Sequence, residues 1–312
     1  MNTKEELVKI MEDFTDLLME LFGSDRKTSF LAASYILSVK TLPAFTSIEE
    51  DGNKKIKKFY DSFKSMSYTP QDMRMAFNEA YLYSLKDVKD FEIETTLELP
   101  LLYLRLLTLA VTDNLNYDHV IVFNPSSNSG SLAASLSLSG KIKDEDLYVL
   151  EDRSDYSRLT LTLRDLCERK YKVSDALPSL SFKADVIVSD PFLRSVEDIL
   201  IFFEDYHEYL NNDGFFIVSL MTDFVRSRVF SDMIEKYGYK FIGLIEYPKD
   251  LMEGLIQNSI VILENKKEEN KEFFHAEMPS IKNVDANIKV MNEIKDYLVH
   301  YIRSENNENN VN

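Results

Sequence analysis

Val120-Ile-Val-Phe-Asn-Pro-Ser-Ser-Asn-Ser-Gly-Ser-Leu132 is the stretch that decides the fold of this 312-residue chain. Its apolar, mostly β-branched start predicts a short buried strand, and the small residues after it predict a tight turn into a helix. In doubly wound α/β domains this turn holds a nucleotide-like ligand, because small residues let the backbone approach and the helix N-terminus offers free N–H groups. Taken alone, the stretch is equally compatible with a plain strand-to-helix connection.

Similar apolar runs recur along the chain, and segments with helical periodicity at 132–139, 157–170 and 196–210 separate them. The runs are His119–Phe123, Leu147–Glu151, Ala184–Ser189, Gly214–Ser219, Lys240–Glu246 and Asn258–Glu264, and a further strand should end at Asp175, within Val173–Leu177. Alternating strands and helices predict a largely parallel sheet with right-handed crossovers. The last two runs have no helix of normal length between them, so we expect an antiparallel edge pair. The predicted fold class is α/β, with a Rossmann-like seven-stranded sheet.

A helical domain precedes the sheet. Residues 5–88 show helical spacing of apolar residues, and Thr69-Pro70-Gln71-Asp72 has the signature of a helix start. We therefore divide the chain into a helical N-terminal domain at 1–112, an α/β domain at 113–268, and a C-terminal segment at 269–312. That last segment contains the end of a charged linker at 265–271, and after it we expect an amphipathic helix at 287–302 and a disordered polar tail at 304–312.

The composition limits the kinds of partner. A net charge of −17 leaves no general basic face, and phosphate contacts normally dominate DNA affinity, so a strong autonomous DNA binder is disfavoured although a local basic strip stays open. The cationic run Asn53–Lys58 is interpreted as a solvated helix face, with a DNA backbone contact as the alternative. A protein partner is also open, and the oligomeric state is not predicted.

Targeting and metal signals are weak. The charged N-terminus is unlike a signal peptide, and no apolar run approaches the roughly 20 residues of a membrane span, so we expect a cytoplasmic protein without membrane contact. The single cysteine, Cys167, fits a core position on a helix, and the four histidines show no metal-ligand spacing. No metal site is predicted.

Acidic residues follow the second and third strands. Glu151 stands about 20 residues after the first turn, where a carboxylate can accept hydrogen bonds from ribose hydroxyls. Asp175 falls at the expected end of the third strand, where it could accept from an adenine amino group. After the fourth strand comes Ser189-Asp190-Pro191-Phe192. Each of these is also compatible with a plain role, Glu151 as a solvated acid and the tetrapeptide as a turn.

The order of these segments resembles that of N6-adenine-specific DNA methyltransferases, which are class I S-adenosylmethionine-dependent enzymes. More closely, the chain resembles the YtxK-like family of methylase-like proteins of Gram-positive bacteria. The resemblance covers roughly Thr69 to Leu263. It includes the helical part, through Thr69-Pro70-Gln71-Asp72-Met73-Arg74, Lys86-Asp87 and Leu99-Pro100.

The resemblance implies S-adenosylmethionine as cofactor and a set of residues that hold it. They are Asn124, Ser126, Asn128, Gly130, Glu151 and Asp175. Three positions depart from the family pattern: Asn124 replaces an aspartate, Asn128 replaces the first glycine of the turn, and Leu99 replaces a threonine. Asparagine tolerates a left-handed backbone, so the turn can keep its shape, but its side chain crowds the ligand.

The resemblance also implies a catalytic set at Ser189, Asp190, Pro191 and Phe192, matching Asn-Pro-Pro-Phe/Tyr. In that chemistry a polar side chain and the next backbone carbonyl accept the two amino hydrogens of adenine. This localises the nitrogen lone pair towards the methyl group, while the aromatic ring stacks on a flipped base. Ser189, the Asp190 carbonyl and Phe192 could supply these parts. Asp190 replaces a proline, which removes the fixed φ and adds a negative charge.

The leading functional hypothesis is an S-adenosylmethionine-binding protein that resembles N6-adenine DNA methyltransferases. The alternative is a catalytically inactive pseudo-methyltransferase that acts as a binding or scaffolding module, favoured by the substituted motif positions. A third hypothesis, methylation of a protein or a small molecule, is compatible with the acidic charge.

Overall fold

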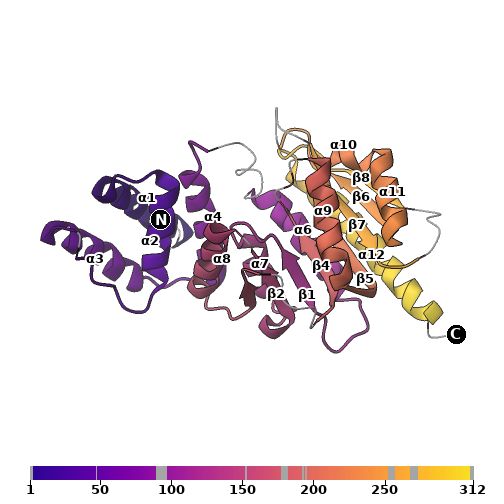
Figure 1. Ribbon diagram of the computed structural model, residues 1–312, viewed down its shortest axis with the longest axis horizontal. Helices are drawn as coiled ribbons and strands as arrows, with labels where there is room; N and C mark the ends of the chain where they lie inside the picture. The colour runs from indigo at the N-terminus through magenta and orange to yellow at the C-terminus, as the bar shows by residue number, and fades with distance from the viewer. Residues whose placement is uncertain are drawn as a thin grey trace.

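A computed structural model describes residues 3–46, 48–88, 97–151, 153–176, 182–191, 193, 195–251, 257–267 and 273–309 of the chain. The molecule is elongated, with the N-terminal helices at one end and the last strands and C-terminal helix at the other (Figure 1). The candidate residue Phe192 and the end of the run Val173–Leu177 lie outside the described residues.

Four helices form the N-terminal part: α1 (Thr3–Phe22), α2 (Arg26–Ser38), α3 (Glu50–Lys64) and α4 (Pro70–Ser84). The helix start predicted at Thr69 is confirmed as a reciprocal capping box. The Asp72 amide donates to the Thr69 hydroxyl at 3.1 Å, and the Thr69 amide donates to the Asp72 carboxylate at 3.2 Å. This satisfies two of the free donors at the helix N-terminus.

The sheet has eight strands in the order β3-β2-β1-β4-β5-β7-β6-β8. Their bounds are β1 Val122–Pro125, β2 Leu147–Leu150, β3 Lys172–Ser174, β4 Ala184–Ser189, β5 Leu210–Met221, β6 Lys240–Glu246, β7 Asn258–Glu264 and β8 Phe274–Glu277. The expected α/β sheet is confirmed, including antiparallel pairing of β6 with β7. The expected number of seven strands is wrong by one, because β8 adds to the edge, parallel to β6.

Helices cover both faces of the sheet. They are α6 (Glu98–Thr112), α7 (Ser131–Ser137), α8 (Ser154–Leu166), α9 (Val196–Tyr206), α10 (Thr222–Val225), α11 (Arg228–Tyr237) and α12 (Val284–Asn309). Short 3₁₀ turns lie at Asp144–Asp146 and His207–Tyr209. Strand residues alternate between two apolar cores. Val186 and Val188 pack with α6 and α12, whereas Ile187 packs with α9 and α11.

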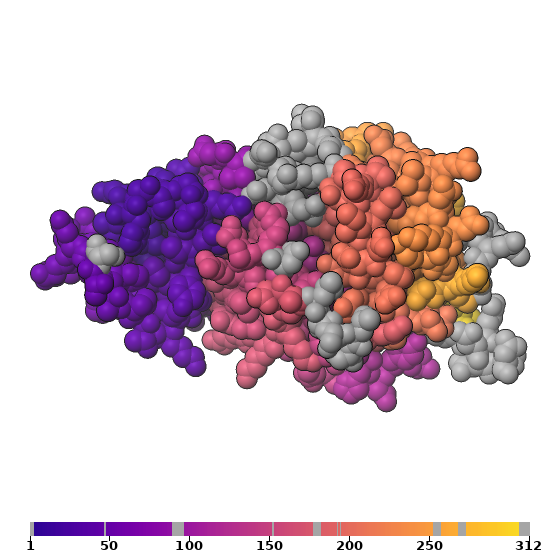
Figure 2. All heavy atoms as spheres, viewed as in Figure 1, coloured from indigo at the N-terminus to yellow at the C-terminus, as the bar shows by residue number. Residues whose placement is uncertain are grey.

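The N-terminal helices share a core with the sheet domain. Leu159 and Leu163 of α8 and Ala134 of α7 pack in one apolar cluster with α1 to α4. Cys167 is buried in the same cluster, as expected. Figure 2 shows the N-terminal helices, in indigo, continuous with the pink surface that follows them in the chain. The helices therefore brace the element that begins at the predicted cofactor turn.

The C-terminal segment differs from expectation. The predicted helix at 287–302 is longer, at Val284–Asn309, so residues 304–309 are helical where a disordered tail was expected. Apolar residues of this helix, including Leu298 and Ile302, are buried against the sheet, and this packing supports a helix whose own end is polar. Among the helices that the structure describes, none is long and apolar enough to cross a membrane.

Candidate functional site

The first strand meets the fourth at the point where the strand order reverses. β1 pairs in parallel with β2 on one side and with β4 on the other, so the carboxyl ends of the three strands share one edge. Asn124 in β1 is buried there, and its side-chain amide donates to the Val188 carbonyl at 2.7 Å. Its Oδ1 atom is also buried and has no hydrogen-bond partner within the described residues. The Asn124 side chain therefore links β1 to β4, and its Oδ1 atom is an acceptor that a ligand could use.

The turn after β1 adopts left-handed backbone conformations. Ser126 has φ 57° and Asn128 has φ 53°, a region in which asparagine is tolerated better than most residues. Gly130 has φ 81° and caps α7. A Cβ atom at Gly130 would lie 2.8 Å from the Thr160 Cα, so the glycine is required by the close approach of α8. The hydroxyl of Ser127 is buried and also without a partner in the described part of the chain.

Glu151, predicted to bind a ribose, braces the turn. Its carboxylate accepts hydrogen bonds from the backbone amide of Asn128 at 2.8 Å and from the backbone amide of Arg153 at 3.4 Å. Only 2% of the residue is exposed. Asp175, the predicted adenine contact, is exposed after the edge strand β3, and no hydrogen bond joins it to the other predicted residues that the structure describes. The structure therefore brings Glu151 to the turn, and Asp175 directly follows Ser174, whose carbonyl accepts from the Glu151 backbone amide at 2.9 Å.

The catalytic tetrapeptide is connected to the turn. The Ser189 hydroxyl, fully buried at the end of β4, donates to the Pro125 carbonyl. The Asn128 side-chain amide donates to the Asp190 carbonyl at 2.6 Å. Pro191 is buried as well. Two side chains therefore link the β1 end to the β4 end, and one of them is Asn128, at the position where the resemblance implies a glycine.

The Asp190 side chain points into the protein. The residue is 7% exposed, and burial raises the pKa of its carboxyl to about 6, although a hydrogen bond with Ser219 lowers it in part. The Ser219 hydroxyl also accepts from the Tyr247 hydroxyl at 3.3 Å. Sequence analysis missed Ser219, although a serine inside the apolar run of β5 is a signal for a buried hydrogen bond.

A second polar connection, also missed, joins the N-terminal helices to this site. The Ser131 hydroxyl at the start of α7 donates to the Asn78 Oδ1 atom at 2.8 Å, and the Asn78 amide donates to Glu98 at 2.9 Å. Arg74 holds the same Glu98 carboxylate with two hydrogen bonds of 3.0 Å. The helices α4, α6 and α7 therefore meet through one partly buried network beside the turn, in which the Glu98 side chain is 45% exposed.

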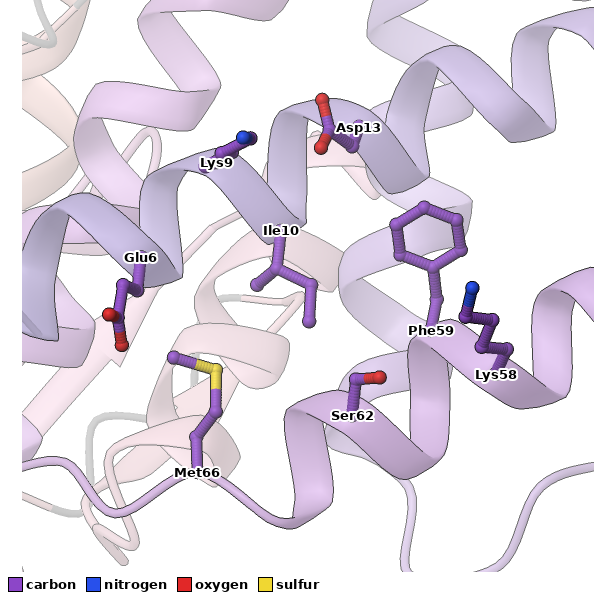
Figure 3. Close-up of a pocket in the computed structure, with 8 residues that line it drawn as sticks. All are labelled: Glu6, Lys9, Ile10, Asp13, Lys58, Phe59, Ser62 and Met66. Carbon is purple, nitrogen blue, oxygen red and sulfur yellow. The ribbon is translucent and has the colours of Figure 1, made fainter. Parts of the chain in front are cut away.

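A separate groove lies in the N-terminal helices, between α1 and α3 (Figure 3). Its volume is about 430 Å³, with Ile10, Phe59 and Met66 among the apolar side chains and charged side chains around them. The charged and polar residues are Glu6, Lys9, Asp13, Lys58 and Ser62. No predicted site residue lines this groove.

The cationic run Asn53–Lys58 is part of α3 and is largely neutralised. Lys54, Lys55 and Lys57 each form an ion pair with an acid four residues away on the same helix. These are exposed pairs at helical spacing, as on a solvated face. The run therefore lies on an exposed helix face, as expected, and its alternative role as a DNA backbone contact stays a prediction.

The chain matches no protein-family model and no curated protein. Among solved structures, a Listeria monocytogenes protein assigned to the class I S-adenosylmethionine-dependent methyltransferases matches with a TM-score of 0.79 and 16% identity, over 95% of this chain and 99% of its own. The fold is that of the class I methyltransferases.

Two restriction-modification subunits share this fold less closely. The methyltransferase subunit of a type I system from Streptococcus thermophilus has a TM-score of 0.57 and 13% identity, over 94% of this chain and 74% of that one. A modification subunit of a type I restriction enzyme from Vibrio vulnificus has a TM-score of 0.53 and 12% identity, over 84% of this chain and 62% of that one. Identities this low establish the fold alone.

Proposed function

We propose that this chain is a pseudo-methyltransferase that binds S-adenosylmethionine at the 124–130 turn and does not methylate adenine. The observation that carries the proposal is the 2.6 Å hydrogen bond from the Asn128 side chain to the Asp190 carbonyl. In the adenine chemistry that the family resemblance implies, this carbonyl must accept a hydrogen of the amino group. Here the Asn128 side chain already occupies one of the two lone pairs of that carbonyl, so the amino group would have to share the acceptor with Asn128.

The other parts of the catalytic set support the same conclusion. The Ser189 hydroxyl is fully buried and directed at the Pro125 carbonyl, so it is not presented to a substrate. Asp190 adds a carboxylate that is ionised above a pH of about 6. A negative charge beside a sulfonium stabilises the reactant cation, and methyl transfer disperses that charge, so the barrier rises.

The turn itself offers groups that fit the cofactor. Two buried acceptors, Asn124 Oδ1 and Ser127 Oγ, have no partner in the described residues, and such atoms are costly unless a donor reaches them. Glu151 adds a buried carboxylate whose oxygens can accept further hydrogen bonds. These three residues would hold the cofactor, which when bound supplies an electrophilic methyl group. The Asn128 side chain lies between this turn and the catalytic end, and it would have to leave the Asp190 carbonyl to open the site.

DNA is disfavoured as the substrate on electrostatic grounds. The net charge is −17, and the lysines of α3 that could contact phosphates are paired with acids. The proteins of similar fold include type I restriction-modification subunits, which keeps adenine in DNA as the alternative substrate for this chain.

The test combines calorimetric titration of S-adenosylmethionine with transfer of labelled methyl groups to DNA. We expect wild type to bind the cofactor and to transfer no label. Asn128→Gly removes one charge-neutral hydrogen bond and frees the turn, so cofactor affinity should rise by roughly fivefold to tenfold. Asp213→Gly is the matched control, because Asp213 has a similar φ of 58° on an exposed part of β5.

Two results would contradict the proposal. Efficient label transfer by wild type would establish the adenine methyltransferase alternative. Absence of binding in wild type and in Asn128→Gly would remove the cofactor and leave a scaffolding role.

A further inference from the structure

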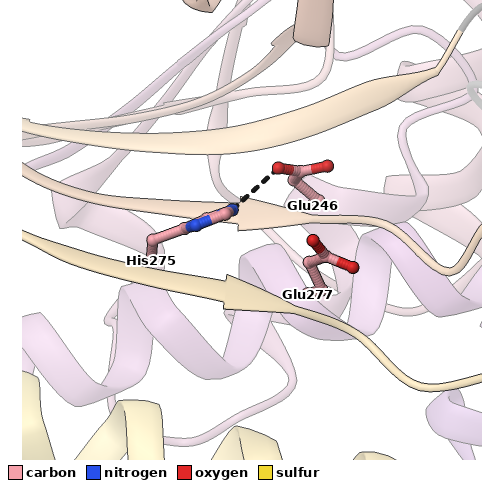
Figure 4. A group of neighbouring side chains, drawn as sticks. All are labelled: Glu246, His275 and Glu277. Carbon is pink, nitrogen blue, oxygen red and sulfur yellow. Dashed lines mark hydrogen bonds and ion pairs between the residues drawn. The ribbon is translucent and has the colours of Figure 1, made fainter.

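Three side chains with metal-binding atoms meet at the carboxyl edge of the last two parallel strands. Glu246 ends β6, and it is paired in register with Glu277 of β8. His275 stands two residues before Glu277, so both side chains extend from the same face of β8. One ligand atom from each of the three lies within 4.8 Å of the other two. Figure 4 shows the imidazole and both carboxylates directed towards one another.

Glu246 is held as a buried anion. Its side chain is 4% exposed, and one oxygen accepts from Arg226 at 2.6 Å and from His275 Nε2 at 2.7 Å.

Two of the three residues line a cavity. Glu246 and Glu277 line a space of about 290 Å³ together with Asp250, Gln257 and Ser280, all of which carry oxygen atoms, whereas His275 lies outside its lining. Lys249 also lines it, with its ammonium group 3.5 Å from the Glu277 carboxylate. A bound ion would therefore have room for water in the positions that the protein does not fill.

We propose that Glu246, His275 and Glu277 bind one divalent transition-metal ion of the Zn²⁺ type. An imidazole nitrogen with two carboxylate oxygens is a ligand set typical of zinc, with Zn–N and Zn–O distances of about 2.0–2.2 Å. Magnesium and calcium prefer oxygen ligands throughout. On binding, the ion would replace Arg226 as the positive charge that neutralises the Glu246 carboxylate. The Arg226 side chain is 56% exposed and has room to turn outward into solvent. The site uses no residue of the cofactor turn and goes beyond the proposed function.

The position of the site gives the ion a structural consequence. β8 has four residues, and its one ladder partner among the described strands is β6. The three ligands come from these two strands, so an ion would hold the edge strand in place. Binding to the folded state raises stability through mass action, so Zn²⁺ should raise the melting temperature.

The experiment is calorimetric titration of ZnCl₂ into the full chain after removal of metal by a chelator. We expect one equivalent to bind, without competition from excess Mg²⁺. His275→Asn and Glu277→Gln should each weaken affinity by at least about tenfold, since losing even an indirect ligand contact costs that much. Arg226→Ala should strengthen affinity, because it removes the cation that competes for Glu246. His119→Asn, a change at a histidine whose side chain is 60% exposed, is the matched control.

Cobalt gives a readout that needs no variant. A nitrogen–carboxylate site with few ligands produces a visible absorption band much stronger than that of aqueous Co²⁺. The proposal is overturned if wild type binds no Zn²⁺, if Co²⁺ keeps its aqueous spectrum, or if His275→Asn and Glu277→Gln bind as wild type does.

Discussion

Replacing Gly130 with alanine tests whether this glycine serves the packing of α8. The added Cβ would lie 2.8 Å from the Thr160 Cα and 3.1 Å from the Thr160 hydroxyl. A backbone atom of a packed helix cannot turn away, so overpacking should cost about 1–3 kcal/mol. The left-handed backbone, at φ 81°, adds about 1–2 kcal/mol for a residue with a side chain. We expect Gly130→Ala to lower the free energy of unfolding by about 2–5 kcal/mol.

The matched control is Gly140→Ala. Gly140 has a similar φ of 74°, but no heavy atom lies within 4 Å of its added Cβ. This variant should therefore show the backbone cost alone, about 1–2 kcal/mol. Urea unfolding followed by circular dichroism measures the free energy of unfolding of both variants. The dependence of this free energy on urea concentration should be the same in each variant as in wild type. Equal losses would refute the packing explanation and would make a ligand the better reason for a glycine at 130.

Two further variants test the buried polar contacts. Asp190→Asn should stabilise the protein by up to about 3 kcal/mol at pH 7, since the folded carboxyl has a pKa of about 6 against an ordinary 3.8. Because the folded state holds the proton more tightly, wild type loses stability between pH 4 and 6, so the difference from Asp190→Asn should grow over that range and stay constant above it. A pH-independent difference in urea unfolding would contradict this. Ser131→Ala removes the donor of the buried hydrogen bond to Asn78 and should cost about 1–3 kcal/mol, more than Ser137→Ala, whose hydroxyl donates to a carbonyl of its own helix. Equal costs for the two serines would count against the Asn78 connection.

The central strands could be predicted because each contains a short, apolar and buried run. The run Ala184–Ser189 is buried over its whole length, as expected of a central parallel strand. The edge strand Phe274–Glu277 escaped prediction because it alternates half-buried and exposed residues over only four positions. Its strand conformation depends on pairing with β6, which local sequence does not encode.

The site was predicted less completely than the sheet, because its contacts join distant residues. Glu151 was expected to face a ligand, and it does directly follow the strand β2. The direction of its side chain, however, depends on the backbone amide of Asn128, which is 23 residues away in the sequence. The bond from Asn128 to Asp190 spans 62 residues. The three residues of the proposed metal site likewise show no sequence spacing, since they come from two strands that are neighbours only in the folded sheet.

Positions that match the family do not by themselves separate an enzyme from a pseudo-enzyme in this chain. Gly130 is needed by the approach of α8, and Glu151 braces the turn, so both residues have structural reasons to be present without any cofactor. The informative position is the one where a substitution creates a contact. Asn128, where the resemblance implies glycine, supplies the side chain of one buried hydrogen bond, and the acceptor is the backbone carbonyl of residue 190, which a proline would also have. A glycine at 128 could not form that bond, so we expect this departure from the resemblance, more than the agreement elsewhere, to decide what the site does.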